Sequence, residues 1–203
     1  MHHRLTALAL ASLLTAPAFA IDGIQTFTSG AHFYKRVVTN TNVLLGSNEK
    51  FEVLPGAETV IFVPPQTVAL VNVGFSAETR CTGALGAQDW CEMAITVNGA
   101  EASPMASTFG GDTFAMDATD SGAASAGNWR AHAFTRHTCV RNTTNAPLAV
   151  TVAANWKVTN FGGTPATFWV DDSALVVEMA RGCSVTDKPA PDSARRSAAA
   201  AQQ

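Results

Sequence analysis

The sequence predicts an all-β protein, an antiparallel two-sheet sandwich of the jelly-roll type, with an immunoglobulin-like sandwich as the alternative. The first observation is the strict alternation of side-chain character in Leu148–Val158, which is typical of a sheet with one buried face. The second is composition: only 14% of residues are charged, fewer than a helical bundle requires. The third is the recurrence of turn residues about every 8–12 positions, which predicts roughly seven to nine strands.

The two ends of the chain differ in character from its middle. Residues 1–20 combine a basic start, the apolar run Leu5–Leu14 and the cleavage pattern Ala18-Phe19-Ala20, which together predict a signal peptide. We therefore expect an exported protein, periplasmic or extracellular. Residues 21–183 predict a single β-sandwich domain, and the Pro-, Ala- and Ser-rich residues 184–203 predict a disordered tail. No later stretch has the ~20 apolar residues of a membrane span.

Strand signals begin weakly and become regular near Phe51. Phe33–Thr39 predicts an edge strand, and the Asn- and Thr-rich Thr39–Asn48 predicts a loop. Glu58–Val63 predicts a strand that ends at Pro64-Pro65, because proline is not tolerated in a central strand. Both faces of Thr67–Glu78 begin apolar, so we expect its first half to be buried on both sides.

The next segment, Cys91–Gly99, is predicted to form a strand and the turn of a hairpin. Every second residue of Cys91–Val97 is apolar and is expected to face inward. Asn98-Gly99 follows and is a strong signal for a type I′ turn. Ala102–Gly111 predicts a loop, Asp112–Met116 a short strand and Ala118–Gly127 a flexible connection.

The strongest strand predictions are Trp129–Asn142 and Leu148–Val158, joined by the polar turn Thr143–Pro147. We expect the first of these to be a central strand. Its inward row is expected to comprise Trp129, Ala131, Ala133, Thr135, His137 and Cys139. The last strand, Ala166–Met179, contains the polar triplet Asp171-Asp172-Ser173, which predicts a bulge midway.

Four cysteines in an exported chain predict two disulfides. We favour Cys81–Cys91, closing a hairpin, and Cys139–Cys183, tying the C-terminus to the core, among three connectivities. On the chain-entropy model these bonds would contribute about 3 and about 4 kcal/mol. A zinc site is disfavoured because the sequence contains no C-x-x-C.

Three short strings carry a resemblance to a known group. They are residues 74–78 (GFSAE), Trp90 through Asn98-Gly99, and residues 169–178 (WVDDSALVVE). Their order resembles small secreted bacterial jelly-roll proteins of mostly unknown function, C1q/TNF-like in general fold. The resemblance covers Glu58–Glu178 and implies the same fold and a bacterial source. It implies no catalytic residues.

One row of side chains is the candidate ligand site. Arg130, His132, Phe134 and Arg136 alternate with the inward row and are expected to face outward. Two guanidinium groups, an imidazole and a ring on one face would suit an acidic sugar or a carboxylate. The alternatives are a solvated face, or a patch covered by another chain or by the N-terminal segment.

Tryptophans offer a second kind of contact, because an exposed ring can stack on a sugar. Trp90 and Trp169 lie beside a loop and a bend and are expected to be partly exposed, whereas Trp129 and Trp156 are expected in the core.

No catalytic set or cofactor site is predicted. The sequence contains no G-x-S-x-G, H-E-x-x-H or phosphate-binding glycine loop. His132 and His137 have an odd separation on one strand, so they cannot share a metal. Oxygen-rich loops would allow a structural Ca²⁺, which we do not predict.

These observations favour an exported, non-enzymatic binding module with carbohydrate as the first ligand class. The alternatives are a structural or self-assembling, trimeric cell-surface subunit, and thirdly a glycan-active enzyme. Expected partners are therefore a glycan or further copies of the chain. Nucleic acid is not expected, because the net charge of −3 provides no basic surface.

Overall fold

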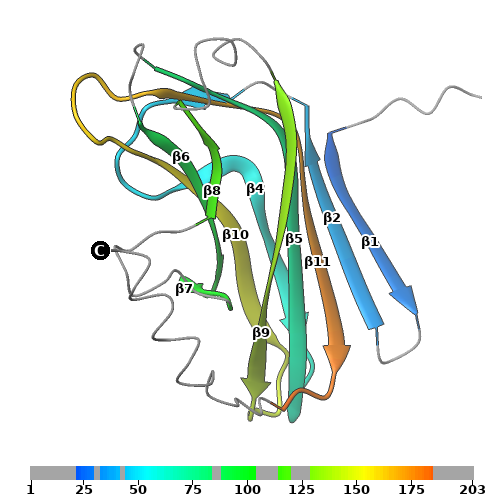
Figure 1. Ribbon diagram of the computed structural model, residues 1–203. Helices are drawn as coiled ribbons and strands as arrows, with labels where there is room; N and C mark the ends of the chain where they lie inside the picture. Colours follow the sequence, from blue (N-terminus) through cyan, green and yellow to red (C-terminus); the bar gives the residue numbers. More distant parts are fainter. Residues whose placement is uncertain are drawn as a thin grey trace, which may run out of the picture.

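The computed structural model describes residues 22–29, 33–41, 44–83, 88–103, 114–119 and 129–184. Every regular element in these ranges is a β-strand, and the strands form two antiparallel sheets packed against each other (Figure 1). The predicted all-β sandwich is confirmed. The predicted signal peptide and nearly all of the predicted tail lie outside the described residues. Within these ranges no helix is long and apolar enough to cross a membrane.

The first sheet has the order β1-β2-β11-β5-β9, with β3 also paired to β11. Its strands are β1 (Gly23–Ser29), β2 (Phe33–Asn40), β3 (Leu44–Gly46), β5 (Thr67–Thr82), β9 (Arg130–Asn142) and β11 (Thr167–Arg181). The second sheet has the order β4-β10-β6, and both β7 and β8 pair with β6. Its strands are β4 (Glu52–Val63), β6 (Trp90–Val97), β7 (Ala100–Glu101), β8 (Phe114–Ala118) and β10 (Leu148–Thr159).

The winding of the chain is that of a jelly roll. Without the accessory strands β1, β3 and β7, the two sheets read β2-β11-β5-β9 and β4-β10-β6-β8. Only β6 is followed by a strand of its own sheet, β8; every other step along the chain leads to the opposite sheet, as in a jelly roll. An immunoglobulin-like sandwich instead pairs successive strands within one sheet more often.

The core lies between the sheets and is built from alternate residues of the long strands. In β5 every odd-numbered residue from Ala69 to Cys81 is buried. Met93 and Ile95 of β6 and Val150 and Val152 of β10 are all 0% exposed, which confirms the inward rows predicted for both strands. Burying each such aliphatic side chain stabilises the fold by about 1.5–3 kcal/mol.

The predicted turn signals are confirmed. Asn98 and Gly99 join β6 to β7 with φ of 51° and 76°, the left-handed conformations that a type I′ turn requires at both positions. In β11 the pairing with β5 shifts register between Asp171 and Ala174, so the polar triplet is the bulge. β4 ends at Val63, directly before the two prolines.

Several strand predictions are corrected. β1 was not predicted, and it makes β2 an inner strand instead of an edge. Residues Asp22–Thr28 are all exposed, so β1 has no buried row to produce a period-two signal. β3 falls in the predicted loop and is only three residues long. The outer row of β5 is not buried as expected: Val68 and Leu70 are half-buried and Asn72 is exposed.

β9 is an edge strand, not the expected central strand. It pairs with β5 along its whole length. On its other side, in the described part of the chain, it receives a single bridge from Ser103 to His137. The chain then crosses to the other sheet, so β9 and β10 lie in different layers (Figure 1).

Asn142 holds this crossing together. Its side chain is buried, and Nδ2 lies 3.0 Å from the carbonyl oxygens of Val63 and Pro64 and 2.8 Å from that of Ala146. Its Oδ1 accepts a hydrogen bond of 2.9 Å from the backbone N–H of Thr144. One amide therefore joins the end of β4 to the turn between β9 and β10.

Both predicted disulfides are confirmed, but their positions differ from the expectation. Cys81–Cys91 has a Cα–Cα distance of 5.9 Å and joins the end of β5 to the start of β6. It links the two sheets and does not close a hairpin. Cys139–Cys183, at 5.7 Å, lies on the outer face of the first sheet, because Cys139 pairs with outward-facing Leu70. Two disulfides indicate an oxidising extracellular environment.

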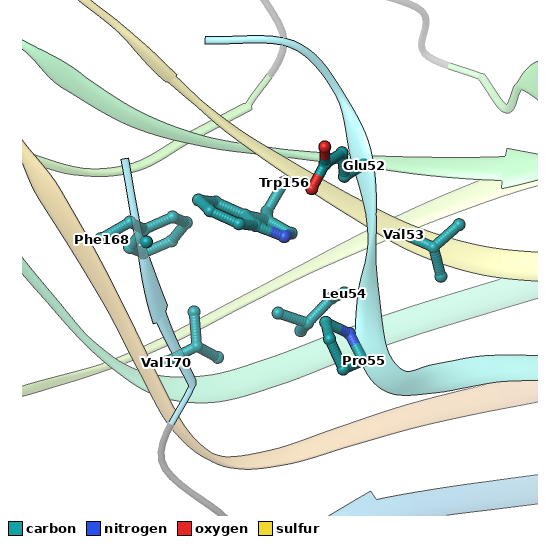
Figure 2. A pocket seen from close by; sticks show the side chains of 8 residues that line it. Glu52, Val53, Leu54, Pro55, Trp156, Phe168 and Val170 are labelled. Atoms are coloured by element: carbon teal, nitrogen blue, oxygen red, sulfur yellow. The ribbon is translucent and has the colours of Figure 1, made fainter. Parts of the chain in front are cut away.

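At one end of the sandwich the core opens into a small cavity. Trp156 and Phe168 meet there edge to face, with ring centroids 6.3 Å apart (Figure 2). A Cβ at Gly46 would lie 2.3 Å from Cη2 of Trp156, so only glycine leaves room for the indole. Trp156 packs against the core, as expected, but it is half-buried and lines the cavity.

Candidate functional site

The predicted ligand row of β9 lies on the inner face of the first sheet, so its predicted outward orientation is wrong. Phe134 is buried and meets Phe75 edge to face, with centroids 6.1 Å apart. The guanidinium carbon of Arg136 lies 4.9 Å from the Phe134 centroid, and Nη1 donates to the Thr135 carbonyl at 3.0 Å. Burial lowers the pKa of Arg136, and the charge of Glu101 partly offsets this.

The other two residues of the row are also turned toward the protein. Nη1 of Arg130 lies 3.9 Å from Oδ1 of Asp117. His132 is half-buried, and its buried Nε2 has no hydrogen-bond partner among the residues that the structure describes. The four side chains share one face, as predicted, but Arg130, Phe134 and Arg136 contact protein groups. Their role in ligand binding stays a prediction.

The orientation was misjudged because Trp129 and Cys139 were treated as core residues. Trp129 is 37% exposed, and Cys139 is held on the outer face by its disulfide. His137, also expected inward, is exposed, as are Ala131 and Ala133 between these residues. Small side chains leave this face open to solvent, whereas the ring of Phe134 requires burial.

The outer face of the first sheet instead carries an aromatic platform. Arg80 of β5 and Trp169 of β11 are paired in register. The guanidinium carbon of Arg80 lies 4.3 Å from the Trp169 centroid and 5.1 Å from that of Trp129. The two indoles meet edge to face at 6.3 Å, and Nε1 of Trp169 donates to Oγ1 of Thr82 at 3.1 Å. Cation–π stacking and this hydrogen bond fix the rings.

A shallow hollow of about 360 Å³ lies on the same face. Its polar lining includes the side chains of Ser76 and Glu78 on β5 and of Asp172 at the bulge of β11. Ala131 and Ala133 of β9 also line it. Glu78 is two residues from Arg80 on the same face of β5, about 7 Å along the strand. The hollow therefore lies beside the platform.

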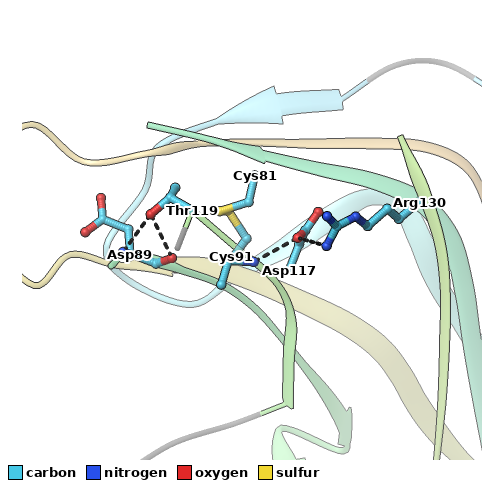
Figure 3. A network of polar contacts seen from close by, with 7 residues as sticks. Cys81, Asp89, Cys91, Asp117, Thr119 and Arg130 are labelled. Atoms are coloured by element: carbon cyan, nitrogen blue, oxygen red, sulfur yellow. Dashed lines mark hydrogen bonds and ion pairs between the residues drawn. A yellow bond between two sulfur atoms is a disulfide. The ribbon is translucent and has the colours of Figure 1, made fainter. Parts of the chain in front are cut away.

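A network at the end of the sandwich holds the strand ends that carry the platform (Figure 3). Cys81 follows Arg80 and is tied to the second sheet by its disulfide. Arg130 follows Trp129 and reaches Asp117 of β8. The Arg130 side chain is 40% exposed and its nitrogen lies 3.9 Å from the carboxylate oxygen, so the ion pair contributes about 1 kcal/mol or less. The disulfide is therefore the stronger of the two restraints.

Asp89 anchors the neighbouring loop. It is fully buried, and its carboxylate accepts the backbone N–H groups of Phe161 at 3.1 Å and Ala166 at 2.8 Å. Its own backbone N–H donates to Oγ1 of Thr119 at 3.0 Å (Figure 3). Asp89 therefore has a structural role, clamping both ends of the loop between β10 and β11.

Trp90 forms a separate aromatic contact at this end. It meets Phe161 edge to face at 4.8 Å, and Phe161 is 56% exposed. Trp90 and Trp169 are both half-buried, which confirms their predicted partial exposure.

Sequence reasoning missed Arg80, Glu78 and Trp129 as surface residues. The alternation that groups Trp129 with Ala131 would have placed Trp129 on the surface had the exposed face been assigned correctly.

Among the residues that the structure describes, no group of three or more His, Cys, Asp or Glu side chains is arranged to hold a metal ion.

Comparison with known proteins adds little to this description. No protein-family model and no curated protein matches the chain. A chain from a solved structure titled "Structure of infectious bursal disease virus Gx strain" is similar with a TM-score of 0.37 and 11% sequence identity. The match covers 87% of this chain and 36% of the viral chain. At this TM-score the similarity supports no statement about function.

Proposed function

We propose that the protein is an exported, non-enzymatic β-sandwich module that binds carbohydrate on the outer face of the first sheet. The observation that carries the proposal is the tryptophan platform lying beside a carboxylate-lined hollow. We call this surface the sugar face and define it by Arg80, Trp129 and Trp169 together with Glu78 and Asp172. The signal-peptide pattern of residues 1–20 and the two disulfides support export.

The chemistry of the sugar face suits a pyranose ring. The C–H bonds on one side of a pyranose pack against the negative face of an indole, and an aromatic contact contributes about 0.5–1.5 kcal/mol beyond area burial. A carboxylate accepts hydrogen bonds from sugar hydroxyls, and such charged hydrogen bonds contribute about 1.5–3 kcal/mol each. One platform with two carboxylates gives a dissociation constant of about 0.1–1 mM.

The charge of the sugar face favours neutral sugars. Glu78 and Asp172 both line the hollow, and a carboxylated sugar would be repelled there. The guanidinium of Arg80 is stacked between two indoles. We therefore propose a neutral sugar in place of the acidic sugar expected from the sequence, because that expectation depended on an outward-facing row that contains Arg130 and Arg136.

A glycan array read with matched variants tests the proposal. We expect the mature protein to bind neutral glycans, and Trp129→Ala and Glu78→Gln to weaken binding at least about tenfold. Phe161→Ala removes an exposed ring elsewhere and should leave binding unchanged. The proposal fails if the wild type binds no glycan, or if Trp129→Ala binds as well as Phe161→Ala.

Self-assembly is a second candidate function, favoured by β1. This strand carries no charged residue, and its outer edge has no partner strand in the described part of the chain. Ile24 and Phe27 are 58% and 51% exposed. Uncharged free edges are templates for strand pairing, so we propose a second copy of β1 as the occupant.

The edge of β4 is protected, in contrast to that of β1. Arg36 of β2 donates to the carbonyl of Val60, and Asn40 donates to that of Pro55 at 3.1 Å.

Light scattering of the mature chain tests self-assembly. A mass above that of one chain in the wild type, which falls to that of one chain in Thr26→Lys, supports it. A wild type that is monomeric at all concentrations contradicts it.

A further inference from the structure

The cavity at the end of the sandwich is separate from the sugar face and has its own chemistry. It has a volume of about 120 Å³ and lies between β3, β4, β10 and β11. Its walls are apolar: Leu54, Phe168 and Val170 are at most 2% exposed, and the indole of Trp156 lies beside Phe168 (Figure 2). Drug-sized sites occupy about 300–1,000 Å³, so this cavity suits a ligand of a few heavy atoms.

A carboxylate lies at the mouth of this cavity. Glu52 and Trp156 are directly opposed in the pairing of β4 with β10, and opposed residues project from the same face of a sheet. Figure 2 shows the carboxylate beside the indole. In the part of the chain that the structure describes, the side chain of Glu52 makes no hydrogen bond and no ion pair. The nearby cation Lys157 is bound to Glu92 at 3.0 Å.

We propose that this cavity binds a small organic ammonium ion with a short alkyl group. The ammonium would lie between the Glu52 carboxylate and the Trp156 ring, where a charge-assisted hydrogen bond and a cation–π contact both favour a positive charge. The alkyl group would pack against Leu54, Phe168 and Val170. A neutral analogue gains only the apolar part, and a carboxylate analogue is repelled by Glu52.

Gly46 makes the site possible. A Cβ at this position would lie 2.3 Å from Cη2 of Trp156, so any side chain would displace the indole that forms the cation contact. The variant Gly46→Ala is therefore expected to displace the Trp156 indole and disrupt the cavity without changing a charged group. It complements substitution of Glu52, which changes the charge and leaves the indole in place.

The test uses n-propylammonium, with n-propanol and propionate as matched neutral and anionic probes. The indole N–H signals of the protein's four tryptophans are followed by ¹⁵N NMR, and Trp156→Phe assigns the signal of interest. We expect the Trp156 signal to shift saturably with n-propylammonium in the millimolar range that suits about four heavy atoms, and the Trp129 and Trp169 signals to stay fixed. Glu52→Gln should weaken binding about tenfold.

Glu58→Gln is the matched control, because Glu58 is exposed on the same strand but does not line this cavity. It should bind n-propylammonium as the wild type does. An unmoved Trp156 signal, equal binding of n-propanol, or equal weakening by Glu52→Gln and Glu58→Gln would each overturn the proposal. None of these outcomes bears on sugar binding, which is read from other tryptophans.

Discussion

The substitution Asn142→Asp tests how the chain passes from one sheet to the other. The two side chains have the same shape, but the aspartate lacks the N–H groups that face the carbonyl oxygens of Val63, Pro64 and Ala146 at 2.8–3.0 Å. An amide nitrogen has two hydrogens, so two buried hydrogen bonds are lost. The new oxygen also lies against these carbonyls.

The expected cost follows from these contacts. A buried group left without its partner costs about 1–3 kcal/mol, so the loss of two donors costs about 3–5 kcal/mol. That is a large fraction of the about 5–15 kcal/mol that stabilises a typical domain. Urea unfolding followed by tryptophan fluorescence measures the free energy of unfolding, with the slope expected to stay constant.

Asn145→Asp is the matched control because Asn145 lies in the same turn and is exposed. Its Oδ1 accepts a hydrogen bond of 3.1 Å from Gln66, which aspartate can also accept. We expect a change of less than about 0.5 kcal/mol. If Asn142→Asp and Asn145→Asp differ by less than about 1 kcal/mol, the crossing is not held by Asn142 and the reasoning is refuted.

Three further variants address other parts of the fold. Asp89→Asn leaves one acceptor oxygen for two backbone N–H groups and should lower the free energy of urea unfolding by about 2–4 kcal/mol; a change below about 0.5 kcal/mol would contradict its clamping role. Gly46→Ala should cost about 1–3 kcal/mol and alter the near-UV circular dichroism of Trp156, whereas an unchanged spectrum would show that the indole has room to move. Replacing Cys81 and Cys91 together by alanine should cost about 3 kcal/mol in thermal unfolding, and an unchanged melting temperature would show that the sheets need no link here.

Alternation and turn residues were sufficient for most of the fold. The buried rows of β6 and β10, the type I′ turn at Asn98-Gly99 and the bulge at Asp171–Ser173 are all local patterns that read directly from the sequence. These features are determined by neighbours along the chain or by a fixed period of two. The two cysteine pairings were also predicted, although the link between the two sheets and the outward position of Cys139 were not.

The candidate site was not predictable in the same way. Alternation correctly separated the two rows of β9, but it does not state which row faces the core. That depends on what packs against the strand, here Phe75 against Phe134. β9 is also an edge strand, so its inner row tolerates Arg130 and Arg136 near solvent. Because polar residues usually face solvent, the row that contains Arg130 and Arg136 was predicted to face outward, and that prediction was wrong.

The sugar face combines residues that are distant along the chain. Arg80 lies on β5, Trp169 lies on β11 and Trp129 directly precedes β9. These strands are neighbours only because the jelly-roll winding orders them β11-β5-β9. No sequence pattern reports which strands are adjacent. The platform therefore became visible only when strand order and register were known.

The most direct measurement of sugar binding follows the four indole N–H signals during titration with the neutral glycan that the array ranks highest. The account predicts that the Trp129 and Trp169 signals shift together along one saturation curve, with the Trp90 and Trp156 signals unmoved. Shifts confined to Trp90 or Trp156, or no shift at saturating glycan, would contradict the assignment of binding to the outer face of the first sheet.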